Sequence, residues 1–285
     1  LKKNSTETST FLVHPRIDKL SLPRDQLDRR AISPTTARNP SVSTGEEFYT
    51  LREYTDGDDL RKVHWPATAK RGRYMIRQEE TPWHTRATIL LDDSAASHDS
   101  GGAGSSFERA VEVAASLIDL YHRSGYSYKL VCSGDDGIPA GRGADQRNRC
   151  LDLLATIDLK AGGRPGELLR ARLSEINIAT SPEAALILAA GTIDPETATL
   201  LAHVSRRFRQ AAVVSAPAHR YGSQPTKARW EMESQVVEAT QLLARSSLRS
   251  MILGPGDPLA SGWTALWSGQ PKGVSDKWGQ KPELV

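Results

Sequence analysis

Short apolar segments alternate with amphipathic helical patterns between residues 86 and 256. The first apolar segment, residues 88–92, ends in an acid and is typical of a strand buried within a parallel sheet. A helical pattern follows from Ser105, which has capping-box spacing to Glu108, and Gly125 ends it. This order predicts a buried strand followed by a helix that covers the sheet.

The same succession recurs further along the chain, where Asp194 and Pro195 have the order of a helix cap and a first helical turn. Regular alternation predicts an α/β fold with a Rossmann-like, doubly wound and mostly parallel sheet over residues 86–256. We expect strands at 128–132, 184–190, 211–214 and 250–253, and helices at 146–158, at 166–176, after 194 and along the stripe Met232, Val236, Ala239 and Leu243.

The remaining parts of the chain have weaker patterns. An irregular N-terminal segment contains a predicted strand at 11–17 and a linker rich in Ser, Thr, Pro and Asn at 35–44. Another strand is predicted at 74–78. The chain is therefore expected to divide into an irregular, β-containing segment and linker (1–44), a motif region (45–85), the α/β domain (86–256) and a C-terminal extension (257–285).

Composition narrows the functional classes. Of the 285 residues, 38% are hydrophobic and 25% charged, which is typical of a soluble globular chain. The formal net charge is only +3, and no dense Lys/Arg run with interleaved aromatic residues occurs, so we expect no nucleic-acid partner. Cys132 and Cys150 lack the spacing of metal ligands and are expected to be buried free thiols of a reducing compartment.

No apolar run reaches about 18 residues, so no segment of this sequence is expected to span a bilayer. The chain begins with Leu1 instead of Met, which suggests a fragment of a longer protein.

A dense mixture of acids, bases and aromatic rings surrounds Gly57. A plain surface loop would not need the aromatic rings, and a plain core strand would not tolerate the charges. The order and spacing of the residues resemble the signature of the DUF-58 family, a domain of unknown function. Lys70 and His64 depart from the usual pattern, and the residues that fit it are Gly45, Glu47, Phe48, Leu51, Arg52, Tyr54, Gly57, Asp58, Arg61, Val63, Trp65 and Ala69.

The resemblance implies a domain like those of von Willebrand factor A, and two transmembrane helices upstream of this sequence. It also implies that the chain is encoded beside MoxR-type AAA+ ATPases and transglutaminase-like membrane proteins. By this resemblance, the chain is the cytoplasmic part of a membrane-anchored, non-catalytic adaptor for such an ATPase.

Two interpretations of the signature motif follow. Arg52, Asp58, Arg61 and Trp65 form a docking surface in the first. In the second, which we favour, the motif is an internal latch in which Arg and Asp pair while Tyr54 and Trp65, with Phe48, pack on the sheet. The latch predicts that Trp65→Ala and Arg61→Ala each cost about 3–5 kcal/mol, the latter by leaving Asp58 unpaired.

The end of the first buried strand holds the second candidate site. Asp92 and Ser94 resemble the start of the Asp-x-Ser-x-Ser metal-ion-dependent adhesion site of von Willebrand factor A domains. Such sites bind Mg²⁺ through carboxylate and hydroxyl oxygens. Read from Asp92, the motif has Ala96 where the second Ser belongs; read from Asp93, it has Ser97 in that place but Ala95 where the middle Ser belongs. Arg164 or Pro165 stands where a Thr belongs, and Gly191-Thr192 stands where Ser-Asp is usual. We therefore expect a degenerate site without a cofactor.

Three functions remain open. An adaptor is favoured, a Mg²⁺-dependent ligand-binding module is the first alternative, and a hydrolase the second. The hydrolase would use Asp92, Ser94 and His98, but no Gly-x-Ser-x-Gly elbow occurs and His98 is expected to be solvated. The glycine-rich residues 101–106 lack the pattern of a nucleotide-binding loop and are interpreted as a connection.

Overall fold

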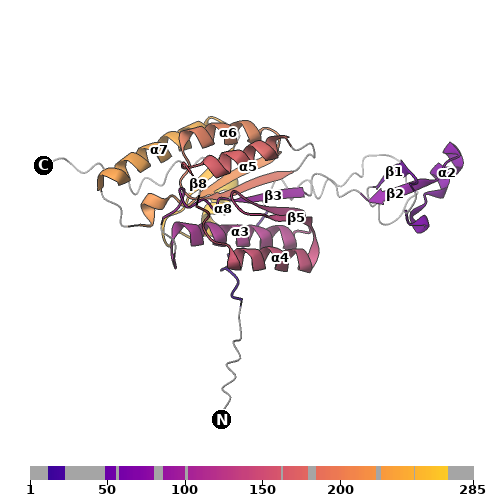
Figure 1. Ribbon diagram of the computed structural model, residues 1–285, viewed down its shortest axis with the longest axis horizontal. Helices are drawn as coiled ribbons and strands as arrows, with labels where there is room; N and C mark the ends of the chain where they lie inside the picture. Colours follow the sequence, from indigo (N-terminus) through magenta and orange to yellow (C-terminus); the bar gives the residue numbers. More distant parts are fainter. Residues whose placement is uncertain are drawn as a thin grey trace, which may run out of the picture.

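A computed structural model describes residues 12–22, 49–55, 58–79, 86–99, 102–161, 163–178, 184–222, 226–246 and 248–268. A six-stranded sheet with helices on both faces forms the main domain, and a small two-stranded unit is drawn apart from it (Figure 1). Among the described residues, no helix combines the length and apolar character needed to cross a membrane.

The main sheet has the strand order β5-β4-β3-β6-β7-β8. All neighbouring strands are parallel except β5, which pairs antiparallel with β4 at one edge. This arrangement confirms the predicted α/β, Rossmann-like doubly wound sheet. The strands are β3 (Arg86–Leu91), β4 (Ser127–Cys132), β5 (Ile138–Gly141), β6 (Ala185–Ala190), β7 (Gln210–Ser215) and β8 (Arg249–Ile252).

Helices cover the two faces of the sheet because side chains of the central strands alternate between two cores. In β3, Ile89 and Leu91 join one core, while Leu90 joins the other. The first core is completed by α3 (Ser106–Arg123), α4 (Gly143–Thr156) and α8 (Leu259–Trp267), and the second by α5 (Glu167–Ile178), α6 (Pro195–Ser205) and α7 (Thr226–Ala244). Figure 1 shows α3 and α4 on one side of the sheet and α5, α6 and α7 on the other.

The predicted helix ends are confirmed. The Ser105 hydroxyl accepts a hydrogen bond from the Glu108 amide at 3.1 Å, and Gly125, just past the end of α3, has φ of 68°. The Asp194 carboxylate accepts a hydrogen bond from the Thr197 amide at 2.8 Å and caps α6, which begins at Pro195.

Residues 12–22 form no strand, so the strand predicted at 11–17 is wrong for the part that is described, 12–17. The segment packs on helices instead of pairing with a sheet. The Asp18 amide donates to the Ser116 hydroxyl of α3 at 2.9 Å, and the Trp263 indole of α8 donates to the Ser21 carbonyl at 2.8 Å. Leu20 is buried in the first core.

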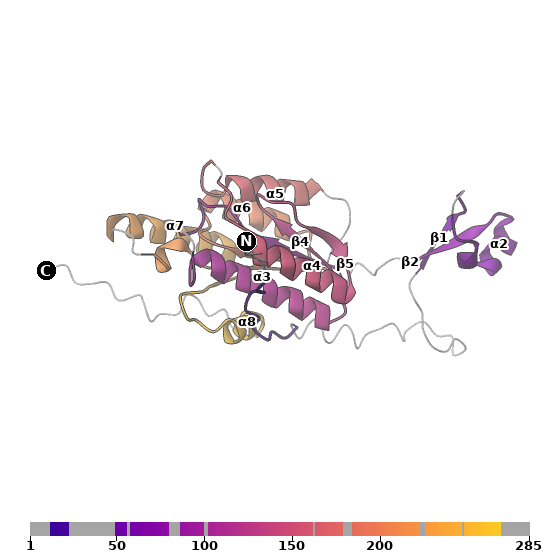
Figure 2. The ribbon, with the colours of Figure 1, turned by 60° about the horizontal axis from the view of Figure 1, so that its bottom comes forward.

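The small unit consists of β1 (Tyr49–Glu53), the 3-10 helix η1 (Leu60–Lys62), α2 (Trp65–Arg71) and β2 (Met75–Glu79). The strands pair antiparallel, and β2 confirms the strand predicted at 74–78 to within one residue. Where side-chain burial is described in this unit, the buried apolar residues are Val63, Met75 and Ile76. Figure 2 also draws this unit apart from the main sheet. Its connections, 23–48 and 80–85, lie outside the described residues.

Candidate functional site

The small unit contains the described part of the signature motif, and an ion pair holds its loop. Arg52 of β1 donates two hydrogen bonds to Asp58, from Nη1 to Oδ2 at 2.6 Å and from Nη2 to Oδ1 at 2.5 Å. The Thr55 amide donates to the same Asp58 Oδ2 at 2.8 Å. A two-point Arg–carboxylate contact fixes both position and orientation, so this pair closes the chain between β1 and η1.

The electrostatics of the pair follow from these bonds. Hydrogen bonding to Arg52, and then to the Thr55 amide, lowers the pKa of Asp58 to about 2. The same contact raises the pKa of Arg52. The expectation that Arg61 partners Asp58 is wrong: Arg61 is exposed, and its backbone amide bonds the Asp59 carboxylate at 3.0 Å. Gly57 lies outside the described residues.

The aromatic residues of the motif form an exposed cluster. The rings of Tyr54 and Tyr74 meet edge to face at 6.2 Å between centroids, and those of Trp65 and Tyr74 do so at 6.4 Å. Trp65 keeps 64% of its surface exposed and Tyr74 keeps 54%. The prediction that Trp65 packs on the sheet is therefore wrong. Trp65 opens the short helix α2, while Val63 and the first residues of β2 fill the interior. Phe48 lies outside the described residues.

The motif thus divides into a paired part and an exposed part. Arg52 and Asp58 pair with each other, which is the part of the latch interpretation that the structure contains. Arg61 and Trp65 face solvent and match the docking interpretation instead.

The second candidate site lies at the switch point of the main sheet. From β3 the chain passes to β4 on one side, while β6, the other neighbour of β3, is followed by β7 on the opposite side. Ligands of doubly wound folds bind beyond the carboxyl ends of strands at such a point. Asp92, Asp93 and Ser94 follow β3 here, Gly191 follows β6 and Ser133 follows β4.

Both carboxyl groups are fully buried and only half satisfied. The Ser133 hydroxyl lies 2.6 Å from Asp93 Oδ1 and 3.0 Å from Asp92 Oδ1, and the Gly134 amide donates to Asp93 Oδ1 at 2.6 Å. The Ser94 amide donates to Asp92 Oδ1 at 3.2 Å. Within the described structure, Asp92 Oδ2, Asp93 Oδ2 and the hydroxyls of Ser94 and Ser97 have no hydrogen-bond partner. Buried groups of this kind call for a cation, a proton or a donor.

Burial raises the pKa of Asp92. The charge of His98 and the hydrogen bonds from the Ser94 amide and the Ser133 hydroxyl act in the opposite direction. Because desolvation is the largest of these effects, the neutral form of this carboxyl group is favoured relative to an exposed aspartate.

The expectation that His98 is solvated is wrong. His98 is buried; its Nε2 donates to the Asp92 carbonyl at 2.7 Å and its Nδ1 lies 3.1 Å from the Ser106 hydroxyl. The ring also meets Phe107 edge to face at 5.3 Å between centroids. Its hydroxyl neighbour is Ser106 and not Ser94, so the Asp92, Ser94 and His98 side chains do not form a nucleophile–base pair here.

The remaining positions do not complete a magnesium site. A Cβ atom on Gly191 would lie 2.1 Å from the Ser97 carbonyl oxygen, so this position has no space for an oxygen ligand. Arg164 is exposed and its amide bonds the Glu167 carboxylate at 2.9 Å. The described residues contain no group of three or more His, Cys, Asp or Glu side chains arranged to hold a metal. Asp92 and Ser94 do lie together, but the set as a whole falls short of the oxygen shell that Mg²⁺ prefers.

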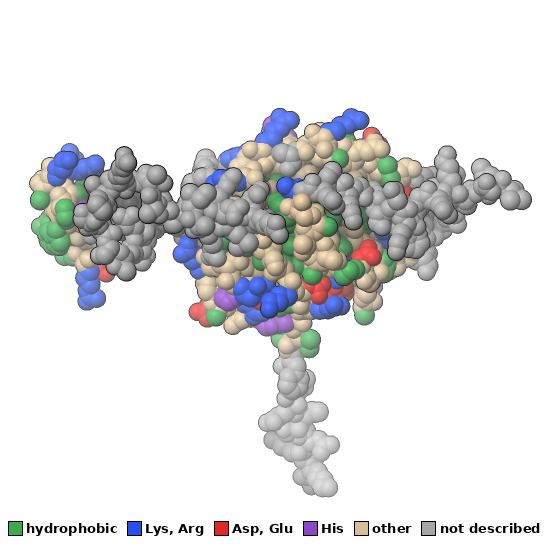
Figure 3. All heavy atoms as spheres, turned by 180° about the vertical axis from the view of Figure 1, so that it is seen from behind, with side chains coloured by type: hydrophobic (Ala, Val, Ile, Leu, Met, Phe, Trp, Pro, Cys, Tyr) green, Lys and Arg blue, Asp and Glu red, His purple; other side chains and the backbone are tan. Residues whose placement is uncertain are grey.

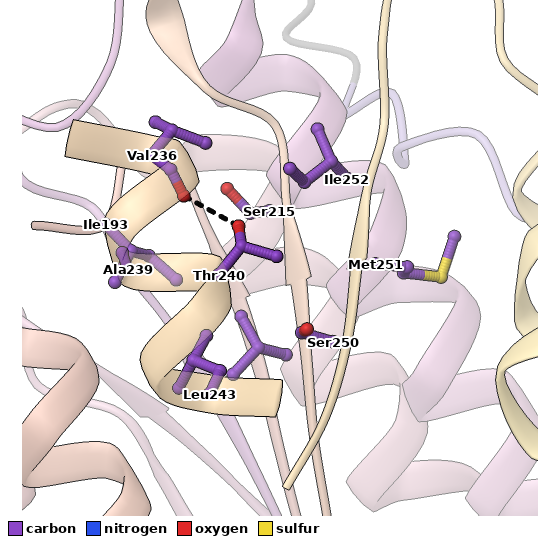
Figure 4. A pocket seen from close by; sticks show the side chains of 10 residues that line it. Ile193, Ser215, Val236, Ala239, Thr240, Leu243, Ser250, Met251 and Ile252 are labelled. Carbon is purple, nitrogen blue, oxygen red and sulfur yellow. Dashed lines mark hydrogen bonds between the residues drawn. The ribbon is translucent and has the colours of Figure 1, made fainter. Parts of the chain in front are cut away.

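A small apolar pocket lies elsewhere, between α7 and strands β7 and β8 (Figure 4). Val236, Ala239 and Leu243 line it from the helix, and Met251 and Ile252 from β8. The Thr240 hydroxyl donates a hydrogen bond to the Val236 carbonyl at 2.7 Å. No charged residue lines the pocket, so it has the character of a packing gap.

The two cysteines are buried, as predicted, and both lie in the first core. Cys132 and Cys150 are buried free thiols, and burial raises the pKa of each to about 12. Neither thiol is suited to act as a nucleophile at neutral pH.

Comparison with known families gives one match. A family model described as "Protein of unknown function DUF58" matches residues 50–246, a span that includes the Arg52–Asp58 pair and the switch point. A search of curated proteins found no match.

Proposed function

The chain belongs to the DUF58 family, and from that premise we propose that it is a non-catalytic adaptor, the cytoplasmic part of a membrane-anchored partner of a MoxR-type AAA+ ATPase. The partnership, the anchoring and a possible second neighbour of the transglutaminase-like membrane class are what the signature resemblance implies. Its main domain would serve as the module resembling von Willebrand factor A.

The observation that supports this proposal most is the closed switch point. The Thr192 amide, after β6, donates to the Ser97 carbonyl, after β3, at 2.7 Å. The Lys160 amide donates to the Asp93 carbonyl at 2.7 Å. These bonds tie three loops together over Asp92 and Asp93, which have no exposed surface. An enzyme on this fold needs an open crevice at this point, whereas a docking module needs only a firm outer surface.

A binding measurement with the ATPase encoded beside the chain tests the proposal. We expect the purified 285-residue chain to bind the immobilised ATPase. Charge reversal of Arg164, which is exposed in the loop that follows Lys160, should weaken binding about tenfold, by analogy with charge pairs at protein interfaces. The matched control is Arg149→Glu, an exposed arginine on α4. Absence of binding by the parent chain, or equal loss in both variants, contradicts the proposal.

The half-satisfied carboxyl groups favour one alternative, a Mg²⁺-dependent ligand-binding module. Asp92 and Ser94 would hold the ion, and a carboxylate of the ligand would complete the coordination shell of the ion. Because Ala96 and Gly191 cannot contribute oxygen side chains, we expect only weak binding. Calorimetry that gives a micromolar dissociation constant for Mg²⁺ or Mn²⁺, abolished by Asp92→Ala, would establish the alternative instead.

A further inference from the structure

The free end of the β1–β2 hairpin has an unusual surface. Tyr49 pairs with Glu79 at the end from which both chain connections leave, and Glu53 pairs with Met75 at the other end. Beyond that pair, the Tyr54 amide donates to the Tyr74 carbonyl at 2.9 Å. The aromatic cluster therefore lies at the end of the hairpin opposite to the connections, where it is presented outward.

We call this surface the hairpin tip and define it by Tyr54, Leu60, Trp65 and Tyr74 with the cations named below. Leu60 is 60% exposed, comparable to Trp65 and Tyr74. The Tyr74 ring contacts the rings of both Tyr54 and Trp65 edge to face, and these contacts leave Trp65 and Tyr74 largely exposed. Tyr and Trp rings have an apolar body and one polar group, a combination suited to a boundary between water and an apolar phase.

Cations outnumber acids among the exposed described residues of the small unit. Exposed acids among the described residues of the unit are Glu53, which pairs with Arg73 at 2.8 Å, and Asp59, which caps η1. Figure 3 shows Lys and Arg side chains and hydrophobic side chains together on the small unit. The exposed cations are Arg61, Lys62, Lys70, Arg71 and Arg73.

We propose that the hairpin tip docks on the surface of an anionic lipid bilayer. In this arrangement, Trp65, Tyr74 and Leu60 enter the headgroup layer while the lysines and arginines contact lipid phosphates. Exposed aromatic rings beside Lys and Arg are the combination that the membrane–water interface favours. The cluster also projects from a hairpin end instead of lining a groove, which suits a deformable lipid surface better than an acidic peptide. The inference does not depend on the ATPase partnership.

Vesicle cosedimentation of the 285-residue chain tests this inference. One set of vesicles contains only phosphatidylcholine. In the second set, phosphatidylserine replaces some of the phosphatidylcholine. We expect binding to the anionic vesicles alone, weakened by added salt. The double variant Trp65→Ala/Tyr74→Ala, and separately Lys70→Glu/Arg71→Glu, should each lower the bound fraction about tenfold, on the basis of lost apolar burial or lost phosphate attraction.

Matched controls keep the result specific. Ile178→Ala removes an exposed apolar side chain from α5, and Arg149→Glu/Arg206→Glu reverses two exposed arginines of the main domain. Both controls should bind like the parent. Circular dichroism should show parental folding for the tip variants, because the replaced side chains are exposed.

Four outcomes overturn the inference: no binding to anionic vesicles, equal binding to neutral vesicles, equal loss in tip and control variants, or parental vesicle binding by the tip variants. If the tip variants keep vesicle binding but lose the ATPase, the tip is a protein contact instead. Loss of vesicle binding with the ATPase contact intact supports the lipid inference, whether or not the adaptor proposal survives its own test.

Discussion

At the scale of single residues, the contact with Arg52 changes the pH range in which Asp58 titrates. Asp58 has a pKa of about 2 in the folded chain, against an ordinary value of 3.8. Because the folded pKa is lowered, the stabilisation is complete above about pH 4 and is lost as the pH falls toward 2. In Arg52→Ala, we expect the Asp58 pKa to return toward its ordinary value.

Carboxyl carbon NMR shifts followed from about pH 6 to pH 3 measure this effect, since an ordinary aspartate titrates within that range. The Asp58 signal should stay nearly constant in the parent and move in Arg52→Ala. Arg61→Ala is the matched control, because Arg61 does not contact the carboxylate. Movement of the signal in the parent would mean that the two-point contact between Arg52 and Asp58 does not persist in solution.

Replacing Trp65 and replacing Met75 should destabilise the small unit to very different extents. Trp65→Ala should change the unfolding free energy of the small unit by less than about 1 kcal/mol, because the side chain is largely exposed. Met75→Ala should cost about 2–5 kcal/mol, because Met75 is buried. Hydrogen exchange of the β1 and β2 amides reports on the unit directly. Faster exchange in Trp65→Ala than in Met75→Ala would restore the buried-latch interpretation.

At the scale of elements, the closure of the switch point depends on a close approach of two loops. A side chain on Gly191 would collide with the Ser97 backbone and with His98 Nδ1. We therefore expect Gly191→Ala to lower the unfolding free energy by about 1–3 kcal/mol through overpacking.

Chemical denaturation of the full chain measures this loss. The control is Gly262→Ala in α8, where the new methyl group meets only the flexible end of the Met251 side chain, and alanine is the better helix former. Equal stability of Gly191→Ala and the parent would show that the loops separate in solution, and the closed site would lose its support.

A helix or strand could be predicted from the sequence where its pattern of apolar and polar residues reflects how it is buried. β3 and β6 are apolar runs buried on both faces, and α3 has a continuous apolar stripe, so the sequence identified all three. β5 was missed because it is a four-residue edge strand with Pro139 and Gly141. α2 and α8 are short, and α8 contains Gly262. Neither has the length over which a helical period becomes distinct.

The candidate sites were predictable only in part, for a related reason. Spacing along the chain placed Asp92 and Ser94 at a strand end, where the structure also has them. Spacing could not show that the hydroxyl of Ser133, 41 residues from Asp92, would lie within hydrogen-bond distance of both carboxyl groups. Nor could it show that His98 would be buried beside the Ser106 hydroxyl. It also could not choose the partner of Asp58 between Arg52 and Arg61, because both lie near in sequence and only the β1 backbone aims Arg52 at the loop.

At the scale of the whole molecule, the small unit is an insertion between two parts of the main domain. Residues 12–22 pack on α3 and α8, the chain then forms the small unit at 49–79, and it returns to the main sheet at β3. Both ends of the insertion are thus tied to the same domain. This order means that a segment far upstream of the sheet contributes to the stability of the sheet.

Leu20 gives the sharpest test of that arrangement. It is 2% exposed within the first core, and the Arg123 guanidinium donates to its carbonyl at 3.1 Å. Leu20→Ala should destabilise the main domain by about 2–5 kcal/mol, as for other buried leucines, and Val13→Ala, at a residue 80% exposed, is the control. Hydrogen exchange should rise in β3 and α3 but not in β1 and β2, because the insertion has its own core. A parallel rise in both units would show that they unfold together, and a rise in neither would show that residues 12–22 do not support the sheet.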